Sequence, residues 1–97
     1  MKKIIKHTLA VTLNTQTFDV PVNTEVIRVA LEPNSKAPTL WTVHRTIDED
    51  ERKELKVKFT TDDRQFGNES KYLGTCVVKQ SDGTFLALHL LEDFSDE

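Results

Sequence analysis

The sequence has few cysteines, which form disulfides, and few glycines and prolines, which interrupt helices and strands. Among its 97 residues are one Cys, three Gly and three Pro, and the formal net charge is only −3. Because Cys76 is the only cysteine, the chain cannot form an intramolecular disulfide, the covalent cross-link that stabilises most small secreted domains. A protein with this weak negative net charge does not have the broad positive potential that nonspecific nucleic-acid binding needs. No run approaches the roughly 18 consecutive apolar residues of a membrane span. We therefore expect a cytoplasmic protein that contacts neither membrane nor nucleic acid.

Length and composition predict a single small domain over residues 1–97. With 37% hydrophobic and 30% charged side chains, the chain can build one core and no second one. The TIM barrel and the doubly wound dinucleotide fold are excluded by length. Lys2, Lys3 and Lys6 make the start basic, whereas the end, at about 92–97, reads as an acidic tail. This charge separation is typical of a dipolar surface, and it also suits a homo-oligomer.

Hydrophobic patterning predicts an all-β domain with at most one short helical turn. Alternating or β-branched runs recur along the chain, and no window shows a sustained apolar stripe of period 3.6. The predicted strands cover residues 4–13, 16–20, 25–31, 39–46, 55–60, 72–79 and 84–91. About seven strands at this spacing indicate a small antiparallel sandwich or a partly open barrel.

Several pairings follow from local signals. The pair Asn14–Thr15 predicts a hairpin between the first two strands, and Asp82–Gly83 predicts one between the last two. The charged stretch 47–54 is expected to be an exposed loop, and 61–71 a long one. The nearly continuous apolar run of the last strand indicates that both of its faces are covered, in a central strand or at an oligomer interface.

Alternation also assigns faces to three of the strands. In 25–31, Ile27 is expected to share a face with Val29 and Leu31, and to oppose Arg28. In 39–46, the face of Trp41, Val43 and Arg45 opposes the face of Leu40, Thr42 and His44. In 55–60, Leu55, Val57 and Phe59 are expected to be buried. Lys56 and Lys58 are expected to be solvent-exposed on the opposite face and to protect a sheet edge from pairing with another strand.

No residue pattern indicates catalysis. The histidines His7, His44 and His89 fall on three different predicted strands without a close pair, so core or interface histidines are favoured over a metal site. Cys76 lies mid-strand, where an inert buried thiol is expected. Asp62 and Asp63 are adjacent acids that usually only solvate a loop. We therefore predict a protein that is not an enzyme and holds neither cofactor nor metal.

With catalysis and metal binding disfavoured, the charged and aromatic residues of the predicted strands are best interpreted as a binding surface. Cations that point outward from strands, with one on the long loop, suit a phosphate or carboxylate ligand, and two aromatic residues suit stacking on a base or anchoring a partner. A solvated sheet face and a core tryptophan are the alternative interpretations. The candidate ligand-binding residues are Arg28, Trp41, Arg45, Lys56, Lys58, Arg64 and Tyr72.

Three blocks of sequence resemble a known family. They are Met1-Lys2-Lys3-Ile4-Ile5-Lys6, Val26-Ile27-Arg28-Val29 with Leu40-Trp41, and Tyr72-Leu73-Gly74-Thr75 with His89-Leu90-Leu91-Glu92. In this order, and over nearly the whole length, they resemble a family of small tailed-bacteriophage proteins known only as a domain of unknown function. The resemblance implies a phage accessory protein that acts in the cytoplasm of a bacterial host.

Taken together, these observations predict action by binding, most simply to counteract a host defence. One version captures a nucleotide-like signal, a small anionic ligand, in pockets between assembled subunits. Another version binds and blocks a host protein. A minor virion or assembly protein, and a host-enzyme inhibitor that uses an edge strand, are the alternatives.

Overall fold

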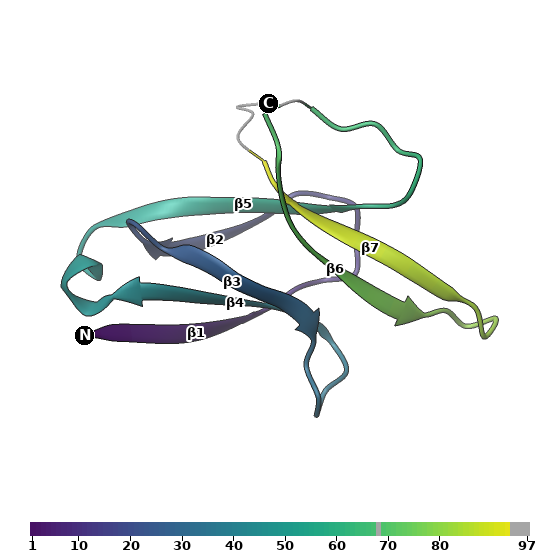
Figure 1. Cartoon of the computed structure of the whole chain (residues 1–97), viewed down its shortest axis with the longest axis horizontal. Helices are drawn as coiled ribbons and strands as arrows, with labels where there is room; N and C mark the ends of the chain where they lie inside the picture. The colour runs from purple at the N-terminus through teal and green to yellow at the C-terminus, as the bar shows by residue number, and fades with distance from the viewer. Residues whose placement is uncertain (68, 94–97) are drawn as a thin grey trace.

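Over the residues that the structure describes, the regular structure is β-sheet, apart from one short helical turn (Figure 1). The computed structural model describes residues 1–67 and 69–93. The strands are β1 (Lys2–Thr8), β2 (Gln16–Pro21), β3 (Glu25–Leu31), β4 (Pro38–Arg45), β5 (Arg52–Thr60), β6 (Lys71–Lys79) and β7 (Phe85–Glu92). A 3-10 turn, η1 (Thr46–Asp48), lies between β4 and β5. The prediction of an all-β domain is confirmed.

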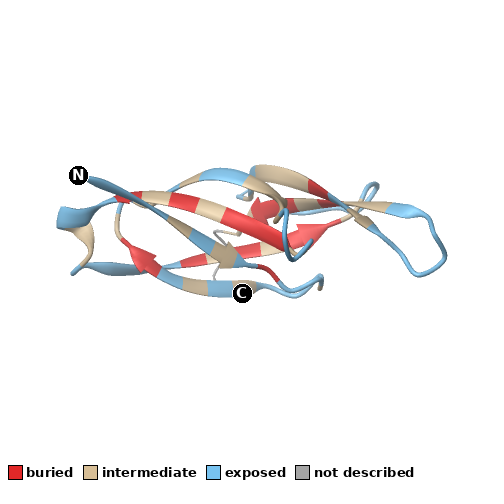
Figure 2. Cartoon of the chain, turned by 90° about the horizontal axis from the view of Figure 1, so that it is seen from below, coloured by how far each residue is buried: buried red, intermediate tan, exposed pale blue. Residues whose placement is uncertain are grey.

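The strands form two antiparallel sheets. Sheet A has the order β1-β4-β3, and sheet B has the order β2-β5-β7-β6. The two sheets form the layers of a flat molecule with extents of 46 × 34 × 15 Å (Figures 1 and 2). That thickness suits two sheets stacked about 10 Å apart. The described chain does not close into a barrel, so the sandwich is the architecture that it adopts.

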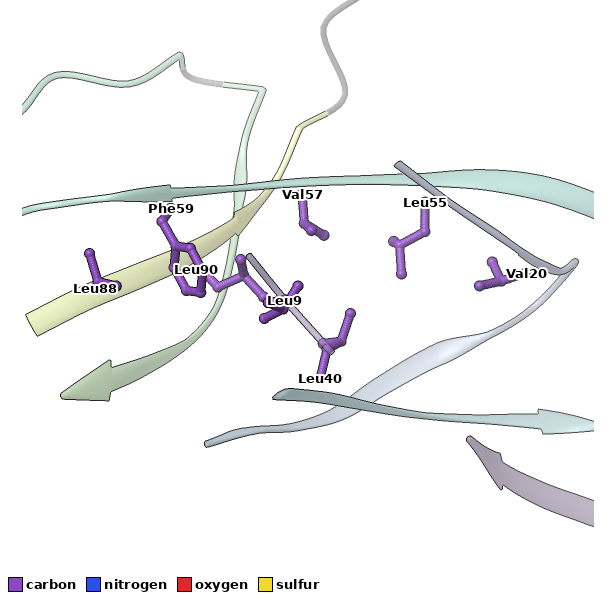
Figure 3. Close-up of a cluster of buried hydrophobic side chains, with 8 residues drawn as sticks. All are labelled: Leu9, Val20, Leu40, Leu55, Val57, Phe59, Leu88 and Leu90. Carbon is purple, nitrogen blue, oxygen red and sulfur yellow. The ribbon is translucent and has the colours of Figure 1, made fainter. Parts of the chain in front are cut away.

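The core lies between the two sheets. Alternate residues of β5 and β7 point inward, as Figure 3 shows, and meet side chains from β4 and from the segment after β1. The side chains of Leu40, Val57 and Leu90 have no solvent exposure. The full buried cluster is Leu9, Val20, Leu40, Leu55, Val57, Phe59, Leu88 and Leu90. The predicted alternation of β4 and β5 is therefore confirmed.

The β6–β7 hairpin follows its local prediction. The Gln80 N–H donates to the Thr84 carbonyl over 2.7 Å, and the Gly83 N–H donates to the Gln80 carbonyl over 3.0 Å. Gly83 has φ of +88°, a conformation that glycine adopts without a steric penalty. Strand β7 lies between β5 and β6, which explains its apolar run: it is the central strand that the sequence indicated.

The predicted hairpin between the first two strands is wrong. Strand β1 ends at Thr8 and pairs with β4 in sheet A, whereas β2 pairs with β5 in sheet B. The chain crosses between the layers after β1: Leu9 is buried in the core, whereas Val11 and Leu13 are exposed. The Gln16 amide stabilises this crossing, because it accepts from the Ala10 N–H at 2.8 Å and donates to the Ala10 carbonyl at 2.9 Å.

Strand β5 is longer than predicted, and it is not an edge. It begins at Arg52, inside the charged stretch expected to be a loop, because residues 52–57 pair with β2. Residues 57–60 pair with β7 on its other side. Lys56 and Lys58 are half-buried on an interior strand, so they do not protect an edge as predicted.

A bulge in β3 changes the predicted faces of that strand. The pairing with β4 shifts between Val26 and Arg28, so the extra residue, Ile27, is 50% exposed. Val26 and Val29 pack against the core instead. The prediction that Ile27 shares a buried face with Val29 is therefore wrong, because a bulge breaks the two-residue period.

The ends of the chain add two observations. The predicted acidic tail overlaps the last strand, because Glu92 belongs to β7, and residues 94–97 lie outside the described part of the chain. Nowhere in that described part is there a helix with the length and hydropathy required to cross a bilayer.

Candidate binding surface

The outer face of sheet A carries a row of two cations and an aromatic residue. Trp41 points to this face because its neighbours Leu40 and Thr42 are buried on the other one. Its register partners are Arg28 on β3 and Lys6 on β1. The Arg28 guanidinium carbon lies 5.7 Å from the centre of the Trp41 ring, within the range of a cation–π interaction. The β3 bulge therefore brings together two residues that the sequence singled out separately.

Apolar side chains surround this row and form a shallow groove. The groove has a volume of about 310 Å³ and is lined by Ile4, Ile27, Arg28, Leu31, Pro33 and Trp41. We refer to it as the Trp41 groove. Ile4 is 61% exposed and Ile27 is 50% exposed, although both are large apolar side chains. Clustered exposed apolar residues of this kind mark interaction sites in soluble proteins.

Among the described residues, the two cations beside the groove have no carboxylate within ion-pair distance. Within residues 1–67 and 69–93, neither Arg28 nor Lys6 forms an ion pair with a carboxylate. The nearby Glu32 is engaged elsewhere: it accepts from the backbone N–H groups of Ser35 and Asn34, at 2.8 and 3.1 Å. These hydrogen bonds lower the pKa of Glu32, and the positive charge of Lys6 lowers it further. Arg28 is thus available to an external anion, whereas Lys6 already interacts electrostatically with Glu32.

The structure does not add the other predicted cations to this surface. Arg45 pairs with Asp48 at 3.0 Å, in the turn after β4. Lys56 and Lys58 lie on the other sheet, where Lys56 is 4.0 Å from Glu54 and Lys58 is 3.8 Å from Asp93. Arg64 is exposed on the loop between β5 and β6. A single chain therefore does not collect the seven predicted residues into one phosphate-binding pocket.

Tyr72 belongs to a different cluster, on sheet B. Its hydroxyl contacts the hydroxyl of Thr75, which lies 2.9 Å from His89 Nδ1. His89 Nε2 lies 2.6 Å from the carboxylate of Asp62, which reaches over from the long loop. No pattern in the sequence links Tyr72, His89 and Asp62. Adjacent β6 and β7 positions bring them together, a relation that appears only once the register Thr75–His89 is known.

The remaining candidates for chemistry are separate from one another. Cys76 is buried, and this burial raises the pKa of its thiol, which keeps it protonated and unreactive. His7 lies 3.0 Å from the Thr42 hydroxyl, and His44 lies 3.3 Å from Glu49. Over the described ranges, no group of three His, Cys, Asp or Glu side chains is placed to hold a metal ion.

One family model matches the chain over residues 1–97, and its description is "Domain of unknown function (DUF7352)". No curated protein and no solved structure matches. The match covers every element of both sheets, including the strands that carry the Trp41 groove.

Proposed function

For this chain, which belongs to the family of unknown function DUF7352, we propose a binding role without catalysis, in which the Trp41 groove captures a partner protein. The observation that carries this proposal is Arg28, which lies over an aromatic ring, in an apolar groove, without an acidic partner among the described residues. Such a site suits an apolar side chain of the partner next to one of its carboxylates. The carboxylate pairs with Arg28, and the apolar side chain fills the groove.

A protein fits this surface better than a nucleotide does. Nucleotide phosphates call for several cations around one pocket, but Lys56 and Lys58 lie on the other sheet and already have carboxylate neighbours. The ring of Trp41 is also covered by Arg28 on one side. The groove is shallow and walled mainly by Ile4, Ile27, Leu31 and Pro33. Capture of a nucleotide-like ligand would require further cations from a second subunit.

The resemblance to tailed-bacteriophage proteins leads us to propose a host protein as the partner and the host cytoplasm as the place of action. In this proposal, the protein counteracts a host defence by occupying a surface of a defence component. This part rests on the resemblance, and the groove supplies only the chemistry of the contact. Partners that bear a carboxylate beside an apolar residue are selected by that chemistry.

Site-specific photo-crosslinking in bacterial cells tests the proposal. One variant carries the photoreactive residue at Ile27, and a matched control carries it at Val77, which is 51% exposed against 50% for Ile27 but lies on sheet B. We expect a discrete host protein to be crosslinked from position 27 and not from 77, and Arg28→Glu to remove that product. The same products from both positions, or no effect of Arg28→Glu, would contradict the proposal.

Native mass spectrometry of the purified protein complements this experiment, because it reports bound small molecules and subunit number together. A retained mass in a discrete oligomer, combined with no protein crosslinked from position 27, would replace our proposal by the nucleotide-capture hypothesis. A chain without added mass agrees with capture of a protein.

A further inference from the structure

Strand β1 forms an open edge of sheet A, beside the Trp41 groove. Figure 1 shows it at the outer margin of the sheet, and in the described structure it pairs with β4 alone. We propose that a segment of the partner protein adds to this edge as a further strand, and that this segment carries an acidic, an apolar and an acidic residue at alternate positions. The inference rests on the proposed capture of a protein, and it specifies which part of that protein is recognised.

The first observation is a row of backbone groups that face the open edge. The Thr46 N–H donates to the Met1 carbonyl at 3.0 Å, and the Leu9 N–H donates to the Pro38 carbonyl at 2.9 Å. The register between these two contacts is continuous, and in an antiparallel pair the residues that bond across the pair alternate with residues that do not. The odd-numbered residues of β1 therefore bond to β4. The even-numbered residues turn their N–H and C=O groups to the open edge, where an added strand would bond to them. These are Lys2, Ile4, Lys6 and Thr8.

The second observation is the alternation of side chains along the same edge. Lys6 is the register partner of Trp41 on the outer face of sheet A, so Lys2 and Ile4 lie on that face too. All three β1 side chains are exposed, and Ile4 also lines the Trp41 groove. A strand added here would place one side chain beside Ile4 and one beside each lysine. An apolar residue between two acids complements this row.

The charge of β1 determines which kind of strand fits. Among the described residues, Lys2 has no carboxylate within ion-pair distance, and Glu32 attracts Lys6 only from beyond that distance. Lys3 adds a positive charge on the other face of β1, 3.9 Å from Glu49. Lysines at a sheet edge oppose indiscriminate strand pairing, and two copies of β1 would repel each other. An acidic strand is attracted instead, so we assign the edge to an acidic segment and not to a second β1.

Amide hydrogen exchange, followed by NMR in the ¹⁵N-labelled full-length protein, tests strand addition. The probe is a peptide blocked at both ends, with the order threonine-glutamate-threonine-valine-threonine-glutamate-threonine. In the free protein we expect fast exchange at the Ile4 and Lys6 amides and slow exchange at those of Ile5 and His7. Saturating peptide should slow exchange at Ile4 and Lys6 by about tenfold or more.

Three results of this experiment would overturn the proposal. One is the absence of binding up to about 5 mM peptide. Another is binding that leaves the Ile4 and Lys6 amides unprotected, because the peptide would then not extend the sheet. The last is slow exchange at these two amides in the free protein, since the edge would then already be paired.

A control peptide of the same composition separates strand addition from simple charge attraction. Its two glutamates are adjacent, so they point to opposite faces of a strand and cannot both meet the lysines of the outer face. We expect this peptide to bind about threefold more weakly or worse. Equal affinities would show that the edge attracts negative charge without recognising the alternation, and would refute the proposed motif.

Two double variants show where the peptide binds. Lys2→Glu with Lys6→Glu reverses the charge of β1, and Lys71→Glu with Lys79→Glu makes the same change at exposed lysines of β6, another edge strand. Both are first shown to be folded by circular dichroism. We expect the β1 variant to bind the glutamate peptide about fivefold more weakly or worse, and to gain affinity for a peptide with lysines in place of glutamates. The β6 variant should do neither, and equal effects would place the peptide elsewhere.

Failure of this inference is distinguishable from failure of the proposed function. Crosslinking from Ile27 and its loss in Arg28→Glu test the groove, whereas β4 separates the open edge of β1 from Arg28. Arg28→Glu should therefore leave peptide binding within about twofold. Protected β1 amides without a crosslinked protein would refute the role of the groove and support the edge. A crosslinked protein together with unprotected β1 amides would do the reverse.

Discussion

The contact between Gly74 and Val29 gives the sharpest test of how the two sheets pack. Gly74 lies on β6 of sheet B, and a Cβ atom added there would stand 2.8 Å from the Cβ of Val29 and 3.1 Å from its Cγ2. Ordinary contact begins at 3.4 Å, so Gly74→Ala must displace β3 and β6 by about 0.6 Å. Because the obstructing Cβ is fixed to the backbone, no rotamer change relieves the overlap. We expect Gly74→Ala to destabilise the fold by about 1–3 kcal/mol.

Urea denaturation followed by circular dichroism measures this cost, and two comparisons isolate its cause. Gly67→Ala is the matched control, since an added Cβ meets no atom within 4 Å there, and its effect should stay within about 0.5 kcal/mol. Val29→Ala keeps the obstructing Cβ, so it should not rescue Gly74→Ala, whereas Val29→Gly should reduce the penalty in a double-mutant cycle. A Gly74→Ala variant as stable as Gly67→Ala would refute the proposed close approach.

Three further predictions concern single side chains. Trp41→Ala should lower the free energy of unfolding, measured by urea denaturation, by about 1–3 kcal/mol. This is less than truncation of a fully buried aromatic side chain costs, because Trp41 is half-buried. A loss near 5 kcal/mol would place Trp41 in the core. Burial lowers the pKa of His7, so the unfolded chain binds the extra proton first and stability should fall as the pH drops below about 6.5. That fall should be smaller in His7→Gln, and equal slopes in both proteins would contradict it. Lys58→Glu places a second negative charge beside Asp93, and should destabilise by about 0.5–1 kcal/mol at low salt but less at about 1 M salt. A loss unaffected by salt would show that the charge pair is not its origin.

Local signals in the sequence predicted the parts of the fold that depend on neighbouring residues. The Asp82–Gly83 turn joins strands that are adjacent in the chain, and the alternation of Leu55, Val57 and Phe59 directly reports one buried face. The failures share another origin. Strand β1 pairs with β4 and not with β2, and residues 52–54 join a strand only because β2 pairs with them. Such pairings depend on contacts across the chain, which a local pattern does not contain.

The candidate surface was predictable only in part, for the same reason. Arg28 and Trp41 were both singled out, but their contact depends on the bulge in β3, and Lys6 was missed because its neighbour Trp41 lies 35 positions away in the chain. Lys58 was expected to be a free cation, yet its carboxylate neighbour, Asp93, follows a different strand. A sequence shows which cations exist. Their availability to a ligand depends on which acids the fold places beside them.

The affinity of the crosslinked partner for two charge-reversal variants tests the proposed binding surface most directly. Arg28→Glu alters the groove, and Arg64→Glu makes the same change at an exposed arginine that also lacks an ion pair among the described residues but lies on the β5–β6 loop. With both variants shown to be folded by circular dichroism, we expect Arg28→Glu to raise the Kd about tenfold or more, and Arg64→Glu to leave it within about twofold. Equal Kd values for the two variants would contradict the assignment of the Trp41 groove as the binding surface.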